Sequence, residues 1–472
     1  MKLKKVLVCV LVLAFCLQSF ASEDRHWTYV ETSTKSGAGS GYVENGSWKL
    51  TATRAKNTSN LTVKGADGEF KGDEPAPMDF TVVKSEDGSQ SYRVVELTTL
   101  FGRYANKALY DYAEKLTELV APDCIKLDTG GYNFNRCANL TKVVLNDEYS
   151  TEIPSAAFSG CTSLSSFSPR VLKCSLIKGE AFKSCAALTG RFDFPECASF
   201  GSNSFNGSGI EEVLAPKATV IQALVFQACV NLSRVTVSEE LSFVGGSAFK
   251  GCTGLDPDFL ETFFAGKSNA GIGTSAFEGC SSLTGPFVWD IGGNCVSNKA
   301  FYNCSALASI VFKKPIDEFQ SLSLDGIKPG AALYMHSTAP SVFARQALAS
   351  SNKTGPYPRI FLQDNFEEWI AALSQYHHVI LKADFNNEEF ESKVEANTCS
   401  HTTRTRQQMV AQMVSDEQMC TFEKTADGKN IATVTMRQKG VIGFMMYHTS
   451  THAQSGCWIM RKPEQGLLII VK

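Results

Sequence analysis

The residues best suited to metal binding or catalysis lie near the end of this 472-residue chain. His448 and His452 are four positions apart, so on a helix both imidazoles would face the same metal ion. His401 and Cys399 are further candidate ligands, earlier in the chain. The Thr-Ser-Thr between the two histidines forms helices poorly and favours a loop between strands. We therefore predict no metal site in this segment.

A second interpretation makes Cys457 a catalytic nucleophile, with His448 or His452 as its base. The run Ser455-Gly456-Cys457-Trp458 resembles the surroundings of a cysteine-protease nucleophile. The resemblance covers four residues at the wrong end of the chain, and no His–Asn pair follows downstream. We predict no catalytic residue and keep a C-terminal cysteine-dependent hydrolase, carried on a scaffold, as an alternative.

Other site chemistry is not indicated. The sequence contains no glycine-rich phosphate loop, no Walker-type motif and no calcium-binding repeat. Its formal net charge of −3 becomes −6 once three N-terminal lysines are removed, and no basic stripe of the kind that binds nucleic acid is present. We therefore expect no cofactor and no nucleic-acid partner.

Thiol chemistry has to be considered, because the chain has sixteen cysteines. Seven of them recur at one position of a repeat, where the one exception is Ser208, another small residue. The position therefore selects small volume rather than sulfur chemistry, and free cysteine behaves as a small buried hydrophobe. We predict buried thiols at this position. Disulfides remain open for the cysteines between repeats, which are Cys124, Cys174, Cys197 and Cys295.

The repeat itself dominates the middle of the chain. A phenylalanine recurs at steps of 24, 24, 23, 21, 23, 28 and 24 residues, usually with a cysteine three positions on and a leucine six positions on. A unit of this length is one coil of a solenoid, because it cannot bury its own apolar face and is stable only when stacked. The eight phenylalanines are Phe134, Phe158, Phe182, Phe205, Phe226, Phe249, Phe277 and Phe301.

Short alternating segments such as Leu140–Leu145 follow the repeat leucine, so each coil should add one strand to a parallel sheet. Gly190 and Gly285 precede strands that carry one extra residue, and we expect a bulge or tight bend at both. The concave sheet of a solenoid is its largest pre-formed surface, so the outward strand positions are the predicted binding site. They are Lys142, Val144, Ser166, Ser168, Arg191, Asp193, Glu212, Leu214, Arg234, Thr236, Ser309 and Val311.

The units Ala157–Leu164, Ala248–Leu255 and Ala276–Leu283 resemble the leucine-rich repeats of the BspA-like family, which centre on Ala-Phe-x-Gly-Cys-x-x-Leu. The resemblance covers roughly residues 97–312. It implies a right-handed β-solenoid of about eight repeats, and many family members are exported surface proteins that bind host or matrix proteins. One departure is the 28-residue step, where we expect a lateral loop around residues 263–266.

The predicted fold class is mostly β with some α: a leucine-rich-repeat solenoid between a small N-terminal β region and a C-terminal α+β region. Residues 1–21 are typical of a secretory signal cleaved after Ala21, and no later segment is long and apolar enough to span a membrane. We assign residues 22–96 to the N-terminal region, 97–345 to the solenoid and 346–472 to the C-terminal cap and α+β region.

The flanking regions contain three weaker signals. Trp27 and Trp48 are the residues that a carbohydrate-binding N-terminal region would use, although a cap or spacer is the simpler interpretation. A capping box at Asp364 predicts a helix with Trp369 on its apolar face. Further on we expect a helix over 403–419, a hairpin at 426–430 and a final strand at 467–471.

Together these observations favour a secreted or cell-surface recognition and adhesion protein, not an enzyme. Its partner would be a host, matrix or surface protein, and the sequence does not indicate an oligomeric state. The alternatives are the cysteine-dependent hydrolase described above and a structural surface protein without a discrete partner.

Overall fold

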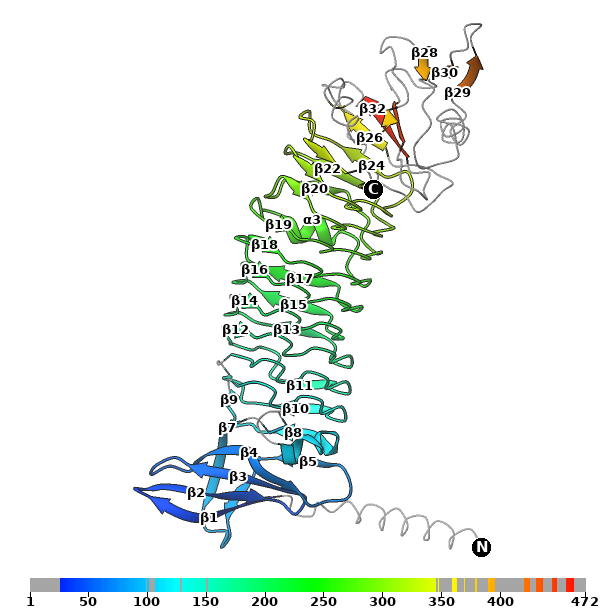
Figure 1. Ribbon diagram of the computed structural model, residues 1–472. Coiled ribbons are helices and arrows are strands. Elements are labelled where there is room, and N and C mark those ends of the chain that lie inside the picture. The colour runs from blue at the N-terminus through cyan, green and yellow to red at the C-terminus, as the bar shows by residue number, and fades with distance from the viewer. Residues whose placement is uncertain are drawn as a thin grey trace, which may run out of the picture. The chain divides into compact units, whose positions relative to one another are not determined.

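The computed structural model describes residues 26–98, 100–101, 107–127, 130–149, 152–344, 347, 359–362, 369, 378–379, 389–394, 420–424, 430–435, 444–447 and 456–461. Over this part of the chain the fold is mostly β, and the helices are short (Figure 1). Contacts divide the chain into two compact units. One comprises Met1–Tyr149 with Ser166–Pro169, and the other comprises Ser150–Ser165 with Arg170–Lys472.

The first unit contains a small closed β-barrel. Neighbouring strands pair in the order β4-β3-β2-β1-β6-β7, and β4 also pairs with β7, which closes the ring. Closure removes the unpaired strand edges that an open sheet would expose. The strands are β1 (Trp27–Lys35), β2 (Ala38–Glu44), β3 (Trp48–Arg54), β4 (Asn60–Phe70), β6 (Val83–Ser85) and β7 (Ser91–Leu97).

The same unit holds a parallel sheet with the strand order β11-β10-β8-β5. Val143 and Phe167 are buried at the centres of β10 and β11, while the residues on either side are half-buried or exposed, as the alternation predicts. The sheet strands are β5 (Ala76–Asp79), β8 (Leu116–Val120), β10 (Lys142–Val144) and β11 (Ser166–Ser168). The remaining short elements are α2 (Lys107–Tyr110), η1 (Ala113–Lys115) and β9 (Lys126–Leu127), which pairs with β7.

In the second unit, successive coils supply strands to two parallel ladders (Figure 1). The first ladder confirms the predicted strands and consists of β13 (Arg191–Asp193), β15 (Glu212–Ala215) and β17 (Arg234–Val237). The second was not predicted, because two residues per coil are too few to show a periodicity. It consists of β12 (Leu176–Ile177), β14 (Ser199–Phe200), β16 (Val220–Ile221), β18 (Phe243–Val244) and β19 (Gly271–Ile272).

The long repeat step forms a helix, α3 (Phe259–Phe264), so the predicted lateral loop is wrong. The apolar side chains of α3 are core residues. The rings of Phe259 and Phe263 lie 5.4 and 5.6 Å from the ring of Phe249, and all three are buried. Burial of its large apolar side chains favours an inward position for this segment. There a helix lets the backbone N–H and C=O groups form hydrogen bonds with one another.

The repeat phenylalanines of the second unit form one continuous column. Their consecutive ring centroids lie 5.2–5.7 Å apart and their planes are within 22° of parallel. Phe134 belongs to the first unit, where its ring lies 6.3 Å from that of Phe101. The stacked column of the second unit runs through Phe158, Phe182, Phe205, Phe226, Phe249, Phe277 and Phe301.

A further coil follows the last repeat phenylalanine. The amide of Phe301 donates to the carbonyl of Ser323, just as the amide of Phe277 donates to that of Ala300. Leu324 therefore occupies the phenylalanine position of this coil, and Ile327 the cysteine position. These two replacements explain why the sequence periodicity fades after Phe312 although the coils continue.

The predicted bends are present before β13 and β20 (Phe287–Trp289). Gly190 and Gly285 have φ values of +84° and +74°, in the left-handed region that glycine adopts without strain. The glycines thus absorb the extra residue that precedes each strand.

After β19, two further ladders follow. One has the strand order β20-β22-β24-β26-β32-β31-β27 and the other β21-β23-β25, and a separate antiparallel sheet has the order β28-β30-β29. The strands are β21 (Cys295–Val296), β22 (Ser309–Phe312), β23 (Glu318–Phe319), β24 (Ala332–Tyr334), β25 (Val342–Phe343), β26 (Arg359–Leu362), β27 (His378–Val379), β28 (Glu389–Val394), β29 (Cys420–Lys424), β30 (Asn430–Thr435), β31 (Phe444–Tyr447) and β32 (Gly456–Arg461).

Two C-terminal predictions can be compared with these strands. The antiparallel pairing of β29 with β30 agrees with the predicted hairpin at 426–430. Trp369 is 2% exposed, as expected for the apolar face of its helix, and its Nε1 donates to the carbonyl of Ser337 at 3.2 Å. The rest of that helix, the helix over 403–419 and the strand at 467–471 lie outside the described residues.

Candidate recognition surface

The outward side chains of β13, β15 and β17 form two rows that run across the strands. In each strand the residue between the two rows is buried, so the rows stand on a packed core. The parallel register fixes which side chains are neighbours. The first row is Arg191, Glu212 and Arg234, and the second row is Asp193, Leu214 and Thr236.

Both arginines on this surface are held by acidic neighbours. Arg191 donates to Asp193 through Nε at 2.6 Å and Nη2 at 3.1 Å. Arg234 donates to Asp256 through Nη2 at 2.6 Å and Nε at 3.2 Å. These hydrogen bonds raise the pKa of both guanidinium groups, which stay charged. Glu212 lies in register between the two arginines, and its negative charge also raises the pKa of both.

Asp256 was not among the predicted surface residues. It follows the repeat leucine Leu255 directly, at a position where most coils have serine or threonine. Asp256 and Glu211 are the two acidic exceptions at this position, and they were the available signal. The significance of Asp256 becomes visible only when the next coil places the carboxylate beside Arg234.

The other predicted positions also point outward. In the first unit, Lys142 lies on β10 with its Nζ 3.5 Å from Glu118 Oε2, and Ser166 and Ser168 flank the buried centre of β11. Val144 is half-buried on β10. The structure thus places these four residues on one sheet of the first unit.

In the second unit, Ser309 and Val311 are the half-buried outward residues of β22. The register sets Val311 between Val288 of β20 and Tyr334 of β24. This part of the ladder therefore presents a more apolar row than β13, β15 and β17 do.

The repeat cysteines face the core. In the described part of the chain, eleven cysteines are free thiols, and all of these except the partly exposed Cys295 are buried, which confirms the predicted buried thiols. The four cysteines for which a disulfide stayed open form none. Burial raises the pKa of Cys229 and of Cys280 to about 12, so neither is a thiolate nucleophile near neutral pH.

These thiols also take part in the stacking of coils. Five of them donate to the carbonyl of the repeat phenylalanine one coil earlier, with sulfur–oxygen distances of 2.9–3.2 Å. The position therefore selects more than small volume, since the thiol also links one coil to the previous one. The donors are Cys185, Cys229, Cys252, Cys280 and Cys304.

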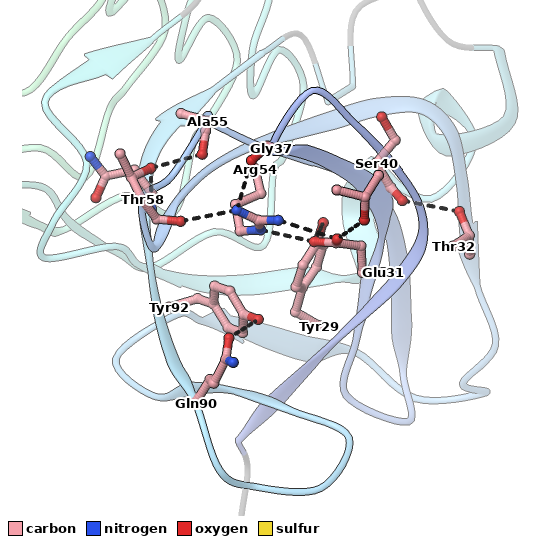
Figure 2. Close-up of polar contacts among 12 residues, drawn as sticks. Tyr29, Glu31, Thr32, Gly37, Ser40, Arg54, Ala55, Thr58, Gln90 and Tyr92 are labelled. Carbon is pink, nitrogen blue, oxygen red and sulfur yellow. Dashed lines mark hydrogen bonds and ion pairs between the residues drawn. The ribbon is translucent and has the colours of Figure 1, made fainter.

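A second polar cluster lies on the barrel of the first unit (Figure 2). The Glu31 carboxylate accepts from Arg54 Nε at 2.8 Å and Nη2 at 3.2 Å, from the Tyr29 hydroxyl at 3.3 Å, and from the Thr34 hydroxyl. The bond from Arg54 is the main cause that lowers the pKa of Glu31 to about 2. A Cβ on Gly39 would lie 2.0 Å from Glu31 Oε2, so glycine makes room for this carboxylate.

The same arrangement argues against a binding role for the cluster. Arg54 also donates through Nη1 to the carbonyl of Gly37 at 3.2 Å, so its guanidinium joins β3 to the hairpin of β1 and β2 (Figure 2). Burial raises the pKa of Tyr29 to about 12, which keeps its hydroxyl a neutral donor. Because Glu31 already accepts four hydrogen bonds, the cluster fastens the barrel.

The two barrel tryptophans do not form a carbohydrate platform. Trp27 and Trp48 are both 0% exposed. Trp27 stacks on Phe80 with ring centroids 4.5 Å apart, and Trp48 Nε1 donates to the carbonyl of Ala76 at 3.4 Å. Both side chains belong to the core.

Of the C-terminal candidates for catalysis or metal binding, only Cys457 lies in the described part of the chain, on β32 opposite Met446 of β31. Its possible partners His448 and His452, together with His401 and Cys399, lie outside that part. Among the residues that the structure describes, no group of three or more histidine, cysteine, aspartate or glutamate side chains could hold a metal ion. Nor does any helix there have the length and apolar character needed to cross a bilayer.

Two solved structures of leucine-rich repeat proteins match part of this chain. A leucine rich cell surface protein from Faecalibacterium prausnitzii A2-165 is 17% identical with a TM-score of 0.36, covering 70% of this chain and 97% of that chain. A leucine-rich repeat protein from Bacteroides ovatus ATCC 8483 is 17% identical with a TM-score of 0.34, covering 68% and 95%. No curated protein matches the chain.

A family model describes the coils directly. Residues 128–256 and 258–328 match the BspA type leucine rich repeat region, in six copies. The match covers the stacked phenylalanines and the outward rows of β13, β15 and β17. It also covers the thiol ladder, which is the series of repeat cysteines that donate to the preceding coil. Over these residues the chain is therefore similar to the BspA type leucine rich repeat region.

Proposed function

We propose that this protein is an exported recognition and adhesion protein that binds another protein through the outward positions of its parallel sheets. The observation that carries the proposal is the double row on β13, β15 and β17. Side chains from three coils stand in register on a buried core, so the surface exists before any partner arrives. A pre-formed surface avoids much of the ordering cost of binding.

The chemistry of these rows suits a protein partner. Arginine, carboxylate, leucine and threonine side chains alternate on the surface, with Arg191 and Arg234 among the most exposed. Protein interfaces combine apolar and polar groups in this way and are enriched in arginine. Export is supported by the secretory features of residues 1–21, and the partner is then an extracellular protein such as a host, matrix or surface component.

Charge reversal tests the proposal. The full chain and its Arg191→Glu, Arg234→Glu double variant are each passed over a panel of purified matrix, serum and cell-surface proteins in a surface plasmon resonance experiment. We expect at least one specific binder, and at least a tenfold weaker affinity for the double variant, because the row becomes wholly acidic.

Lys217→Glu is the matched control, since Lys217 pairs with Glu196 in the turn after β15 and not on the two rows. It should bind like the wild-type protein. Absence of any binder, or a binder with the same affinity for the double variant, would overturn the proposal for this surface.

A further inference from the structure

A column of side chains runs beside the stacked phenylalanines and contains two carboxyl groups. It is formed by the residue that follows the phenylalanine position of each coil. Hydrogen bonds between coils fix the order, because the carbonyl of each column residue accepts an amide of the previous coil, as Asp325 accepts from Asn303 at 2.8 Å. Four successive members of the column are Lys250, Glu278, Tyr302 and Asp325.

Glu278 shows how a carboxylate is accommodated in this column. Its Oε1 lies 2.9 Å from Nζ of Lys250, which comes from the previous coil. Burial by itself would raise the pKa of Glu278, but the hydrogen bond from Lys250 helps to outweigh it and the pKa is lowered. Glu278 is therefore ionised and paired at neutral pH.

In the described part of the chain, Asp325 has no such cation. The column residue before it is Tyr302, and Lys299 places its Nζ 5.5 Å from the centre of that ring. Asp325 is 6% exposed, and its Oδ1 has no hydrogen-bond partner among the described residues. Burial raises the pKa of Asp325 to about 7, against a smaller opposing effect of the Gly326 backbone.

The charged residues around Asp325 can be named for each coil. On its own coil, Lys328 is exposed. The next coil meets this one where the Leu324 amide donates to the carbonyl of Ala347, and residues 347–351 contain no titratable side chain. Arg345 lies outside the described residues. No charged side chain of the described residues contributes to the raised pKa of Asp325.

We propose that Asp325 makes its coil a pH-sensitive segment of the solenoid, which is closed most firmly when the carboxyl group is protonated. An ionised carboxylate that is buried without a cation is costly, and opening of the coil returns it to water. The same coil supplies β22, which pairs with β20 and β24. Its opening therefore also loosens the outward row that contains Val311.

The raised pKa fixes the direction of the pH dependence. Below about pH 4 the carboxyl group is protonated in the closed and in the opened coil. As the pH rises toward the pKa of about 7 in the closed coil, only the opened coil loses its proton. The equilibrium constant for opening then increases by up to about tenfold for each pH unit and levels off at higher pH. Stability is thus present in acid and lost on the way to neutral pH.

Hydrogen exchange of the full chain, followed by mass spectrometry and corrected for the intrinsic pH dependence of amide exchange, tests the proposal. Protection of the amides in residues 309–327 should fall by about tenfold or more between pH 5 and pH 8 in the wild-type protein. Asp325→Asn has the same shape and no charge. It should keep one level of protection across this range and exceed the wild-type protein at the alkaline end. Circular dichroism confirms that each variant is folded.

Glu278→Gln is the matched control from the same column. Because it removes the ion pair with Lys250, it should lower protection of the coil that contains Phe277 at the alkaline end, which is the opposite sign. Equal protection of residues 309–327 in the wild-type protein across the pH range overturns the proposal. Lower protection of Asp325→Asn than of the wild-type protein at the alkaline end also overturns it, because a cation such as Arg345 would then stabilise the carboxylate.

Discussion

Cys229 and Ser208 occupy the same position in successive coils, yet only one of them has a partner. The Cys229 thiol donates to the carbonyl of Phe205 at 3.0 Å. The Ser208 hydroxyl is buried without a hydrogen-bond partner. The carbon–sulfur bond is longer than the carbon–oxygen bond, so a thiol reaches a carbonyl that a hydroxyl at this position does not. An unsatisfied buried hydroxyl typically costs about 1–3 kcal/mol.

Ser208→Cys should therefore stabilise the protein. The new thiol would reach the Phe182 carbonyl, and we expect the free energy of unfolding in urea to rise by about 1 kcal/mol. Cys229→Ser is the matched control and should lower it by a similar amount. A Ser208→Cys variant less stable than the wild-type protein would contradict the proposed role of the thiol ladder.

At the scale of elements, the turn that carries each repeat phenylalanine has a fixed backbone geometry. The residue two positions after the phenylalanine has a positive φ in successive coils, for example +75° at Gly251 and +58° at Ala228. This explains the glycine in the repeated phrase, because other residues lose roughly 1–2 kcal/mol in the left-handed conformation. In coils that have alanine, serine or asparagine at this position, packing against the neighbouring coils keeps the residue in the left-handed conformation.

Ala228→Gly should raise the free energy of unfolding by about 0.5–1 kcal/mol, since relief of backbone strain exceeds the added entropy of the unfolded chain. Gly251→Ala is the reverse experiment and should lower it. A Cβ at Gly251 would meet no atom closer than 3.9 Å, so the loss reports the backbone angle and not a clash. Equal stability of all three proteins in thermal unfolding would exclude left-handed strain as the reason for the glycine.

The two rows of outward side chains on β13, β15 and β17 belong to this scale as well. Each strand of the first ladder is only three or four residues long. A surface large enough for recognition arises because parallel register aligns equivalent positions of consecutive coils. No single element presents it.

At the scale of the whole molecule, stability in the second unit is a sum of contacts between neighbouring coils. The Phe277 ring stacks on Phe249 at 5.2 Å and on Phe301 at 5.6 Å. The barrel of the first unit has its own core and closes on itself through β4 and β7. Loss of one coil contact should therefore act locally before it acts globally.

Phe277→Ala should cost about 3–5 kcal/mol of stability, because it leaves a cavity in the column. Hydrogen exchange followed by mass spectrometry should show faster exchange first in the coils that contain Phe249 and Phe301. Amides of β1 to β4 should keep their wild-type protection, and Phe80→Ala in the barrel should give the converse result. Uniform acceleration along the chain after Phe277→Ala would show that the coils do not behave as nearest-neighbour units.

Much of the central architecture could be predicted because every coil provides the same environment. A phenylalanine, a small residue and a leucine at constant spacing report which side chains face the core, and the strand alternation reports which face outward. The sequence-based prediction failed for segments whose structure depends on contacts with other parts of the chain and not on a repeated spacing. The rings of α3 were assigned to a loop, and the closure of the barrel through β4 and β7 left no periodic signal.

The sequence by itself determined the length of the coil, the stacked phenylalanines and the outward position of Arg191, Glu212 and Arg234. Only the tertiary structure decided that the repeat thiols donate to the preceding coil and that Asp256 accepts the hydrogen bonds of Arg234. The physical reason is distance along the chain. Periodicity records the environment of a residue within its own coil, whereas its hydrogen-bond partner comes from a coil more than twenty residues away and depends on register.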